Sequence, residues 1–120
     1  MKKFNLLIIL SFYIALSYSL SAQTNTLGSS WSFNQSLQSY SLSSNNGERS
    51  MTLDVDFKTP LKKIPQIFLS VTQIDADKET NLRYNVEAIS ISRDGFTLKV
   101  KTWSDSKIFS ISGYWLATTD

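Results

Sequence analysis

Cysteine and histidine are both absent from this 120-residue chain. Without cysteine there is no disulfide framework, which many small secreted domains need for stability. The apolar core or self-association must therefore stabilise the fold. The same absences remove the thiol nucleophile, the usual general base and the best transition-metal ligands. Any catalytic chemistry would depend on carboxylates, lysine, tyrosine or serine.

A long hydrophobic run is also lacking, although the N-terminus is apolar. The chain begins Met1-Lys2-Lys3, continues through an apolar stretch at 6–16 and then has small residues up to Ala22, which is the pattern of a secretory signal peptide. The apolar stretch, at about 11 residues, is shorter than the roughly 20 that a membrane-spanning helix needs. We predict that residues 1–22 are removed and that the mature protein is secreted, without membrane insertion. An uncleaved N-terminal anchor is the alternative.

Excess charge of one sign is missing from the predicted mature chain. The full sequence has 12 Lys and Arg against 10 Asp and Glu, and its pI near 8.9 reflects this surplus. Lys2 and Lys3 would leave with the signal peptide, so the remaining side-chain charges balance. Nucleic acids and anionic lipid surfaces select cationic proteins. We therefore expect neither as a partner.

Helical periodicity is absent after residue 22, where no segment repeats apolar residues at the 3.6-residue spacing of a helix. Apolar and polar residues alternate instead, as in half-buried strands. The strands expected after residue 50 are 51–57, 66–74, 83–92, 96–102 and 107–118. With a strand before residue 51, the sum is about six antiparallel strands. This predicts an all-β fold, a six-stranded antiparallel β-sandwich in a single domain.

Finer expectations concern individual segments. The apolar, β-branched segment 66–74 and the last strand are predicted to be central strands. The apolar phase changes at Ile89 and Ile91, which indicates a bulge or burial on both faces. Turns are expected at Asn45-Asn46-Gly47, Arg93-Asp94-Gly95 and Ser104-Asp105-Ser106, the last two closing hairpins.

Residues 23–50 differ from the rest in composition. They are rich in Ser, Asn, Gln and Gly, with aromatic residues such as Trp31 and Phe33 scattered among them. We expect an N-terminal arm containing a first, short edge-strand region, packed on the body of the sandwich at 51–120 or on a neighbouring copy of the chain. A flexible lead-in is the alternative.

Several short anchors follow one another in the second half of the chain. They are the segment from Pro65 to Asp75, Asn81-Leu82-Arg83, Asp94-Gly95-Phe96, Thr102-Trp103, and Ser112-Gly113-Tyr114-Trp115-Leu116-Ala117. Their order and spacing, from about Phe57 to Ala117, resemble the H-type lectin domain. The resemblance implies a six-stranded antiparallel sandwich that assembles as a homotrimer. It also implies binding of galactose-type sugars, notably N-acetylgalactosamine, in clefts between subunits.

The arginine of the Asn-Leu-Arg segment is the central residue that the resemblance implies. In the family it donates hydrogen bonds to sugar hydroxyls, and here it is Arg83. The planar fork of guanidinium donors suits two vicinal hydroxyls better than a lysine ammonium would. The alternative for Arg83 is a solvated cation, or an ion pair with Asp75 or Asp77.

The resemblance implies two further groups of carbohydrate-binding residues. A glycine and an acidic residue of an N-terminal loop correspond to Gly47, offering a backbone N–H, and Glu48, with Asn46 as the other candidate for the acidic role; a plain turn is the alternative. From the adjacent subunit come Trp103, Ser104 and Phe109. The family has a histidine where Ser104 stands and a tyrosine where Phe109 stands. Aromatic packing against the sugar survives these changes. Packing in the core or at an interface is the alternative for Trp103 and Phe109. The imidazole is lost, so plain galactose or another glycan is the alternative to N-acetylgalactosamine.

Three functions are compatible with these observations: a secreted lectin, a structural or adhesive trimer that has lost sugar binding, and an enzyme. A glycosidase needs two carboxylates, and the available acids are Glu48, Glu87, Asp94 and Asp105. They fall on expected turns or polar strand faces, so we predict no catalytic residue and no enzyme. No cofactor is expected. The acidic pair in Asp75-Ala76-Asp77 matches calcium patterns only weakly, so no metal site is predicted.

Overall fold

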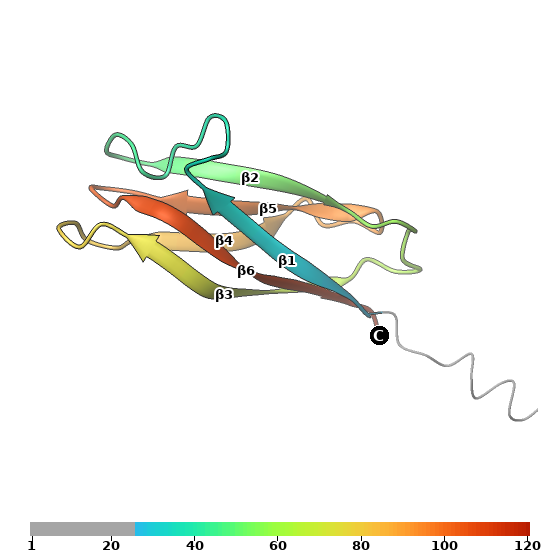
Figure 1. The fold of residues 1–120 in the computed structure, drawn as a ribbon. Coiled ribbons are helices and arrows are strands. Elements are labelled where there is room, and N and C mark those ends of the chain that lie inside the picture. Colours follow the sequence, from blue (N-terminus) through green and yellow to red (C-terminus); the bar gives the residue numbers. More distant parts are fainter. Residues whose placement is uncertain (1–25) are drawn as a thin grey trace, which may run out of the picture.

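The computed structural model describes residues 26–120, and every regular element in that range is a β-strand (Figure 1). The strands are β1 (Thr26–Asn34), β2 (Arg49–Asp56), β3 (Gln66–Ala76), β4 (Tyr84–Ile89), β5 (Gly95–Thr102) and β6 (Ile108–Thr118). The predicted signal peptide at 1–22 lies outside the described residues. Among residues 26–120 no helix is long and apolar enough to cross a membrane.

The six strands form two three-stranded sheets, with the orders β1-β6-β3 and β2-β5-β4, and all neighbouring strands are antiparallel. The sheets stack face to face, as Figure 1 shows. The predicted all-β class and the six-stranded antiparallel sandwich are thereby confirmed. Side chains alternate between the faces of a strand, so each sheet directs one row of apolar residues into the space between the sheets.

The core lies between the two central strands. Leu98 and Val100 from β5 and Ile108 and Ile111 from β6 are fully buried. Beside them the rings of Phe57, Phe96 and Trp115 form a cluster with centroid separations of 5.4 to 6.2 Å. Tilted and edge-on contacts at these distances stabilise a core beyond the area that they bury. This core stands in for the missing disulfides.

Strand β1 joins the sandwich through two buried aromatic residues. Trp31 and Phe33 are both almost fully buried, and the Trp31 indole donates a hydrogen bond to the Tyr114 carbonyl over 3.2 Å. Antiparallel pairing with β6 runs along the whole of β1. The segment from residue 23 to 50, which was expected to be an arm, therefore contains an edge strand of nine residues, Thr26–Asn34.

The segment between β1 and β2 packs against the start of β6. Leu42 is fully buried, and its carbonyl accepts the Ile108 N–H at 2.9 Å. The Tyr40 hydroxyl donates a 2.6 Å hydrogen bond to the Ile108 carbonyl. Burial of this phenol raises its pKa from 10.0 to about 12, because the charged phenolate is poorly solvated there.

The prediction that 66–74 forms a central strand is wrong. Strand β3 is an edge strand, because β6 lies between β1 and β3. Its burial alternates, and Phe68 on the outer face is 54% exposed. The apolar appearance of this segment comes from the row of side chains that faces the core, to which Phe68 adds one apolar residue on the outer face. The central position expected for the last strand is correct.

Two expected local features also differ in the structure. The turn at 104–106 does not close a hairpin, because it carries the chain from β5 in one sheet to β6 in the other. The phase change at Ile89 and Ile91 is not a bulge, since β4 ends at Ile89 with regular pairing to β5. The register shifts lie in β3 instead. The predicted hairpin around residues 93–95 is correct and joins β4 to β5.

Candidate functional site

Three loops meet at one end of the sandwich because of the register of one sheet. Arg49 at the start of β2 and Tyr84 at the start of β4 both lie opposite Thr102, at the end of β5. The residues just before β2, just before β4 and just after β5 are therefore neighbours (left side of Figure 1). The candidate residues Asn46, Gly47, Glu48, Arg83, Trp103 and Ser104 all belong to these loops. We call this the loop end of the molecule, formed by residues 44–48, 81–83 and 103–106.

A buried arginine fastens two of these loops to each other. The Arg49 side chain donates from Nε to the Gly47 carbonyl (2.9 Å), from Nη1 to the Ser44 and Ser106 carbonyls (3.1 and 2.8 Å), and from Nη2 to the Ser104 carbonyl (3.1 Å). Only 8% of this residue is exposed. A planar fork of several donors can satisfy carbonyls on two loops at once. The loop end is therefore held in one arrangement before any ligand arrives.

Sequence reasoning missed Arg49. An arginine next to Glu48 at the start of an alternating strand has the signature of a solvated cation. Arg49 is buried because backbone carbonyls accept its hydrogen bonds. Every residue has a carbonyl, so the sequence does not show which carbonyls lie close to Arg49.

The first loop has the predicted turn geometry. Asn45 and Gly47 have positive φ values of 62° and 85°, a region that these two residue types tolerate. The Gly47 N–H donates to the Ser104 carbonyl at 2.9 Å. Lys107 donates from Nζ to Asn46 Oδ1 at 2.8 Å and also to the Asn45 carbonyl. The Gly47 N–H that the resemblance assigned to a ligand is therefore engaged within the chain.

The backbone around Arg83 is fixed from both sides. Its N–H donates to Ser106 Oγ at 2.8 Å, and its carbonyl accepts from Thr102 Oγ1 at 2.5 Å. The Ser106 hydroxyl in turn donates to the Asn81 carbonyl. Both hydroxyl residues are fully buried. Thr102 at the end of β5 and Ser106 in the loop after it thus hold the Asn-Leu-Arg segment in place.

The guanidinium of Arg83 is paired but accessible. Its Nη1 lies 3.7 Å from Asp105 Oδ1, and 42% of the Arg83 side chain is exposed. The expected alternative partners, Asp75 and Asp77, are not the ones it meets. Asp105 Oδ1 is itself buried and has no hydrogen-bond partner within residues 26–120. An exposed fork beside a buried carboxylate oxygen is an arrangement that could receive a hydroxyl-rich ligand.

The loop after β5 presents an aromatic ring and a strained serine. Trp103 is 38% exposed, and the Lys101 Nζ lies over its ring, 5.8 Å from the ring centroid. Ser104 has a φ of 60°, which is uncommon for a residue other than glycine. Its carbonyl accepts both the Gly47 N–H and the Arg49 guanidinium. These two hydrogen bonds hold Ser104 in its unusual conformation.

Phe109 is the one candidate outside the loop end as defined. It is the second residue of β6 and is half-buried. Because only Lys107 separates the loop at 103–106 from β6, Phe109 lies at the same end of the molecule but in the other sheet. Within a single chain, Phe109 and Arg83 therefore belong to different layers of the sandwich.

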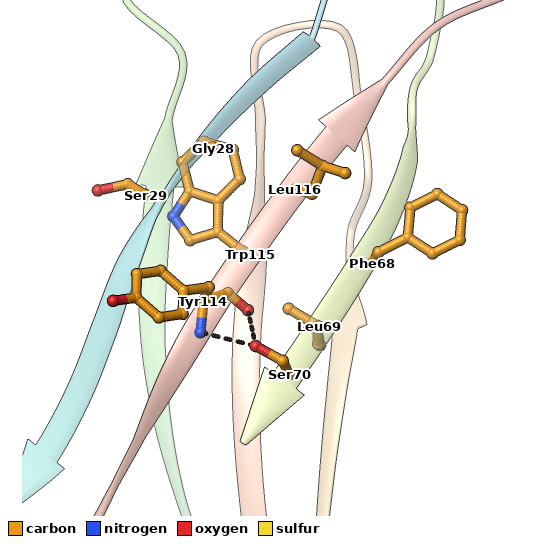
Figure 2. Close-up of a pocket in the computed structure, with 8 residues that line it drawn as sticks. All are labelled: Gly28, Ser29, Phe68, Leu69, Ser70, Tyr114, Trp115 and Leu116. Carbon is orange, nitrogen blue, oxygen red and sulfur yellow. Dashed lines mark hydrogen bonds between the residues drawn. The ribbon is translucent and has the colours of Figure 1, made fainter. Parts of the chain in front are cut away.

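The larger hollows found in the described part of the chain lie elsewhere. One, of about 450 Å³, is a shallow depression on the outer face of the β1-β6-β3 sheet (Figure 2). It is lined by Gly28, Ser29, Phe68, Leu69, Ser70, Tyr114, Trp115 and Leu116. Another, of about 740 Å³, lies between the start of β1 and the loop 56–62. Neither hollow is lined by a residue of the loop end.

Comparisons with known proteins agree with the fold and with the anchors. Residues 52–118 match the family model of the H-type lectin domain. The chain is 36% identical over 72 residues to the protein of ORF 7 in the ATP synthase subunits region of Fuscovulum blasticum, covering 60% of this chain and 63% of that one. It is 30% identical over 78 residues to a discoidin-1 polypeptide of Dictyostelium discoideum, covering 64% of this chain and 31% of that one. The chain thus spans less than two thirds of the length of these relatives.

The solved structure of wild-type discoidin II from Dictyostelium discoideum is similar in fold. It superposes with a TM-score of 0.71 over 82% of this chain and 37% of the discoidin chain, at 19% sequence identity. At this identity the likeness shows the β-sandwich fold alone.

Proposed function

This chain belongs to the H-type lectin domain family, and from that premise we propose that it is a secreted lectin. It binds glycans that end in galactose or N-acetylgalactosamine, at clefts between the subunits of a homotrimer. Three features support the proposal: family membership over residues 52–118, the apolar N-terminus typical of secreted proteins, and the loop end. The function is binding without turnover, with no cofactor.

The single observation that carries the proposal is the presentation of Arg83. Its backbone is fixed by Thr102 and Ser106, yet its guanidinium remains 42% exposed. Fixing the backbone lowers the entropy that binding must remove. The parallel N–H groups of the fork then donate to two vicinal hydroxyls of the sugar.

The neighbouring loop contributes polar partners. Glu48 is exposed and accepts a hydrogen bond from a sugar hydroxyl. Asn46 presents its amide Nδ2 as a donor, because its Oδ1 is occupied by Lys107. Gly47 contributes a turn conformation that only glycine adopts easily, and its N–H stays with Ser104.

The second wall of the site comes from a neighbouring copy of the chain. The exposure of the Arg83 guanidinium and the separation of Phe109 and Arg83 into different sheets support this proposal. Trp103 and Phe109 of the neighbour pack against the apolar face of the sugar. Ser104 replaces the imidazole of the family pattern with a short hydroxyl, so galactose is bound about as well as N-acetylgalactosamine.

A glycan array tests this function directly. Labelled mature protein, residues 23–120, is compared with Arg83→Ala. We expect selective binding to terminal galactose and N-acetylgalactosamine that the mutant loses. Binding to other sugars would be compatible with the same site but with a different specificity. A folded trimer that binds no sugar would contradict the lectin proposal.

A structural or adhesive trimer without sugar binding is the second candidate. One observation favours it: the Gly47 N–H, a sugar donor in the resemblance, is already donated to Ser104. Saturable sugar binding that depends on Arg83 would exclude this candidate. A glycosidase remains the least supported function, since Glu48, Glu87 and Asp94 are exposed surface acids. Residues 26–120 also hold no cluster of three or more acidic, histidine or cysteine side chains that could bind a metal.

A further inference from the structure

Asp105 is the one charged group of the loop end that the proposed function leaves without a role. We infer that Asp105 is the positioning residue of Arg83, and that the charge-balanced Arg83–Asp105 pair restricts the site to neutral sugars. This inference rests on the proposed lectin function and adds to it the class of glycan that is accepted.

The two side chains face each other across a short gap. Arg83 Nη1 and Asp105 Oδ1 are 3.7 Å apart, which is ion-pair distance but longer than a direct hydrogen bond. Asp105 Oδ1 is buried and lacks a hydrogen-bond donor among the described residues. A buried acceptor without a partner is costly, and here the nearest cation is Arg83. A small rotation of the guanidinium therefore gives both groups a hydrogen bond.

Backbone hydrogen bonds fix the positions of Arg83 and Asp105 relative to each other. On one side of Asp105, the Ser104 carbonyl is held by Gly47 and Arg49. On the other side, Ser106 is buried and binds the Arg83 N–H. The backbone on either side of Asp105 is thus held by hydrogen bonds, and one of them also holds the backbone of Arg83. Asp105 is fixed opposite the Arg83 side chain, and only side-chain rotations separate the present geometry from a direct contact.

Orientation of the fork is the first consequence. With one edge of the guanidinium turned toward Asp105, the remaining N–H groups point in a defined direction toward solvent. A carboxylate that fixes the plane of an arginine selects which pair of hydroxyls it can reach. Asp105 acts through Arg83 by its Oδ1 atom, which is buried and faces the guanidinium, although 44% of the Asp105 side chain is exposed.

Charge is the second consequence. Asp105 cancels the positive charge that Arg83 would otherwise present to a ligand. A sugar carrying a carboxylate or sulfate would bring a second negative group close to Asp105, and like charges at such a distance repel. The pair therefore accepts hydroxyls and disfavours acidic sugars. An arginine without such a neighbour would attract them.

Calorimetric titration of mature protein with two matched sugars tests the inference. The probes are methyl β-galactopyranoside, which is neutral, and its C6 carboxylic acid, methyl β-galactopyranosiduronic acid, which has the same ring and anomeric stereochemistry. For Asp105→Asn we expect binding of the neutral sugar to weaken about five-fold, near the upper end of what a partly exposed ion pair contributes. Binding of the acidic sugar should strengthen. The Asp94→Asn variant, an exposed acid in the β4–β5 connection, should leave both affinities unchanged.

The result that overturns the inference is an Asp105→Asn variant with both affinities within two-fold of the unaltered protein, a margin of about 0.4 kcal/mol. A second measurement does not depend on the ligand. Nitrogen NMR of the Arg83 guanidinium, assigned with Arg83→Ala, should show hindered rotation that Asp105→Asn releases. Equal rotation in both proteins contradicts the positioning role. If the unaltered protein binds no sugar, the lectin proposal fails, and the NMR result still decides whether Asp105 positions Arg83.

Discussion

At the scale of single residues, this chain depends on side chains that hydrogen-bond to backbone carbonyls far away in the sequence. Arg49 and Thr102 illustrate the point. Arg49 donates to four carbonyls on two loops, and Thr102 holds the carbonyl of Arg83. Such contacts arrange the candidate site without touching a ligand. Predictions about them concern stability and preorganisation.

Replacing Arg49 by methionine should destabilise the protein. Four loop carbonyls lose the hydrogen bond from Arg49, and of these the Ser104 carbonyl keeps the Gly47 N–H. Leaving a buried polar group unpaired costs about 1–3 kcal/mol when water cannot reach it. We expect a loss of about 3 kcal/mol in the free energy of unfolding, measured by urea denaturation, because some carbonyls will find water. Arg49→Lys should recover only part of it, since one ammonium cannot reach all four carbonyls. An unchanged urea midpoint for Arg49→Met would show that the loops do not need this cation.

Tyr40 should make the protein sensitive to alkali. Its pKa is raised from 10.0 to about 12 by burial, so the folded state holds the phenolic proton more tightly than the unfolded state. The stabilisation is fully present below pH 10 and is lost as the pH rises from about 10 to about 12. This loss of stability is measured by comparing the melting temperatures of the unaltered protein and the Tyr40→Phe variant between pH 10 and pH 12. The mutant should be less stable at neutral pH, because the Ile108 carbonyl loses its donor, and the difference should shrink in alkali. A difference that stays constant with pH would contradict this assignment.

At the scale of elements, the close approach of neighbouring strands explains why residue 113 is a glycine, which the alternation of apolar and polar residues does not explain. Gly113 is in the central strand β6, between Trp31 of β1 and Val71 of β3. A Cβ at this position would lie 1.7 Å from the Ser70 carbonyl oxygen and 3.1 Å from the Trp31 ring. The backbone of β3 could pass so close only because this residue is glycine, and a register shift in β3 follows directly at Val71.

Gly113→Ala is therefore expected to be strongly destabilising. Overpacking of a tight site typically costs about 1–3 kcal/mol, and a clash with backbone belongs at the upper end of that range. The measurement is the free energy of unfolding in urea. Gly47→Ala is an informative comparison, because a Cβ there meets nothing within 4 Å and only the positive φ is unfavourable. Gly113→Ala should cost clearly more; an equal or smaller loss would contradict the close approach.

At the scale of the whole molecule, the proposed trimer needs surfaces at which copies of the chain can meet. Arg83 and Trp103 are partly exposed, and large apolar side chains elsewhere, such as Phe68 and Tyr114, are more than half exposed. Exposed apolar side chains grouped on one face mark an interaction surface more often than chance. Both observations fit assembly of copies of the chain, as proposed for the trimer.

Light scattering on the mature protein should give the mass of a trimer, and Arg83→Ala should leave that mass unchanged while removing sugar binding. Three sites on one particle also predict avidity. Binding to a surface dense in galactose should exceed binding to a monovalent galactoside by about 10² or more. A monomeric mass would remove the between-subunit cleft from the mechanism. Equal affinity for dense and monovalent sugar would contradict the three-site arrangement.

The sequence by itself determined the class of fold and most of its strands. Alternation of apolar and polar residues is a local property, and it located β2 and β5 to within two residues. The order of short anchors identified the family, and the Asn-Leu-Arg segment made Arg83 a candidate for sugar binding, which stays a prediction. Turn geometry at Asn45 and Gly47 was also readable, because positive φ selects these residue types.

Only the tertiary structure decided which sheet each strand joins and which groups meet at the loop end. Alternation says which face of a strand is apolar, but it does not say which strand lies beside it, so β3 was expected at the centre and lies at an edge. Burial of Arg49 and the pairing of Arg83 with Asp105 depend on loops brought together from more than 50 and more than 20 residues apart. Long-range hydrogen bonds and ion pairs are made by position in space, and a single sequence records the side chains without their distances.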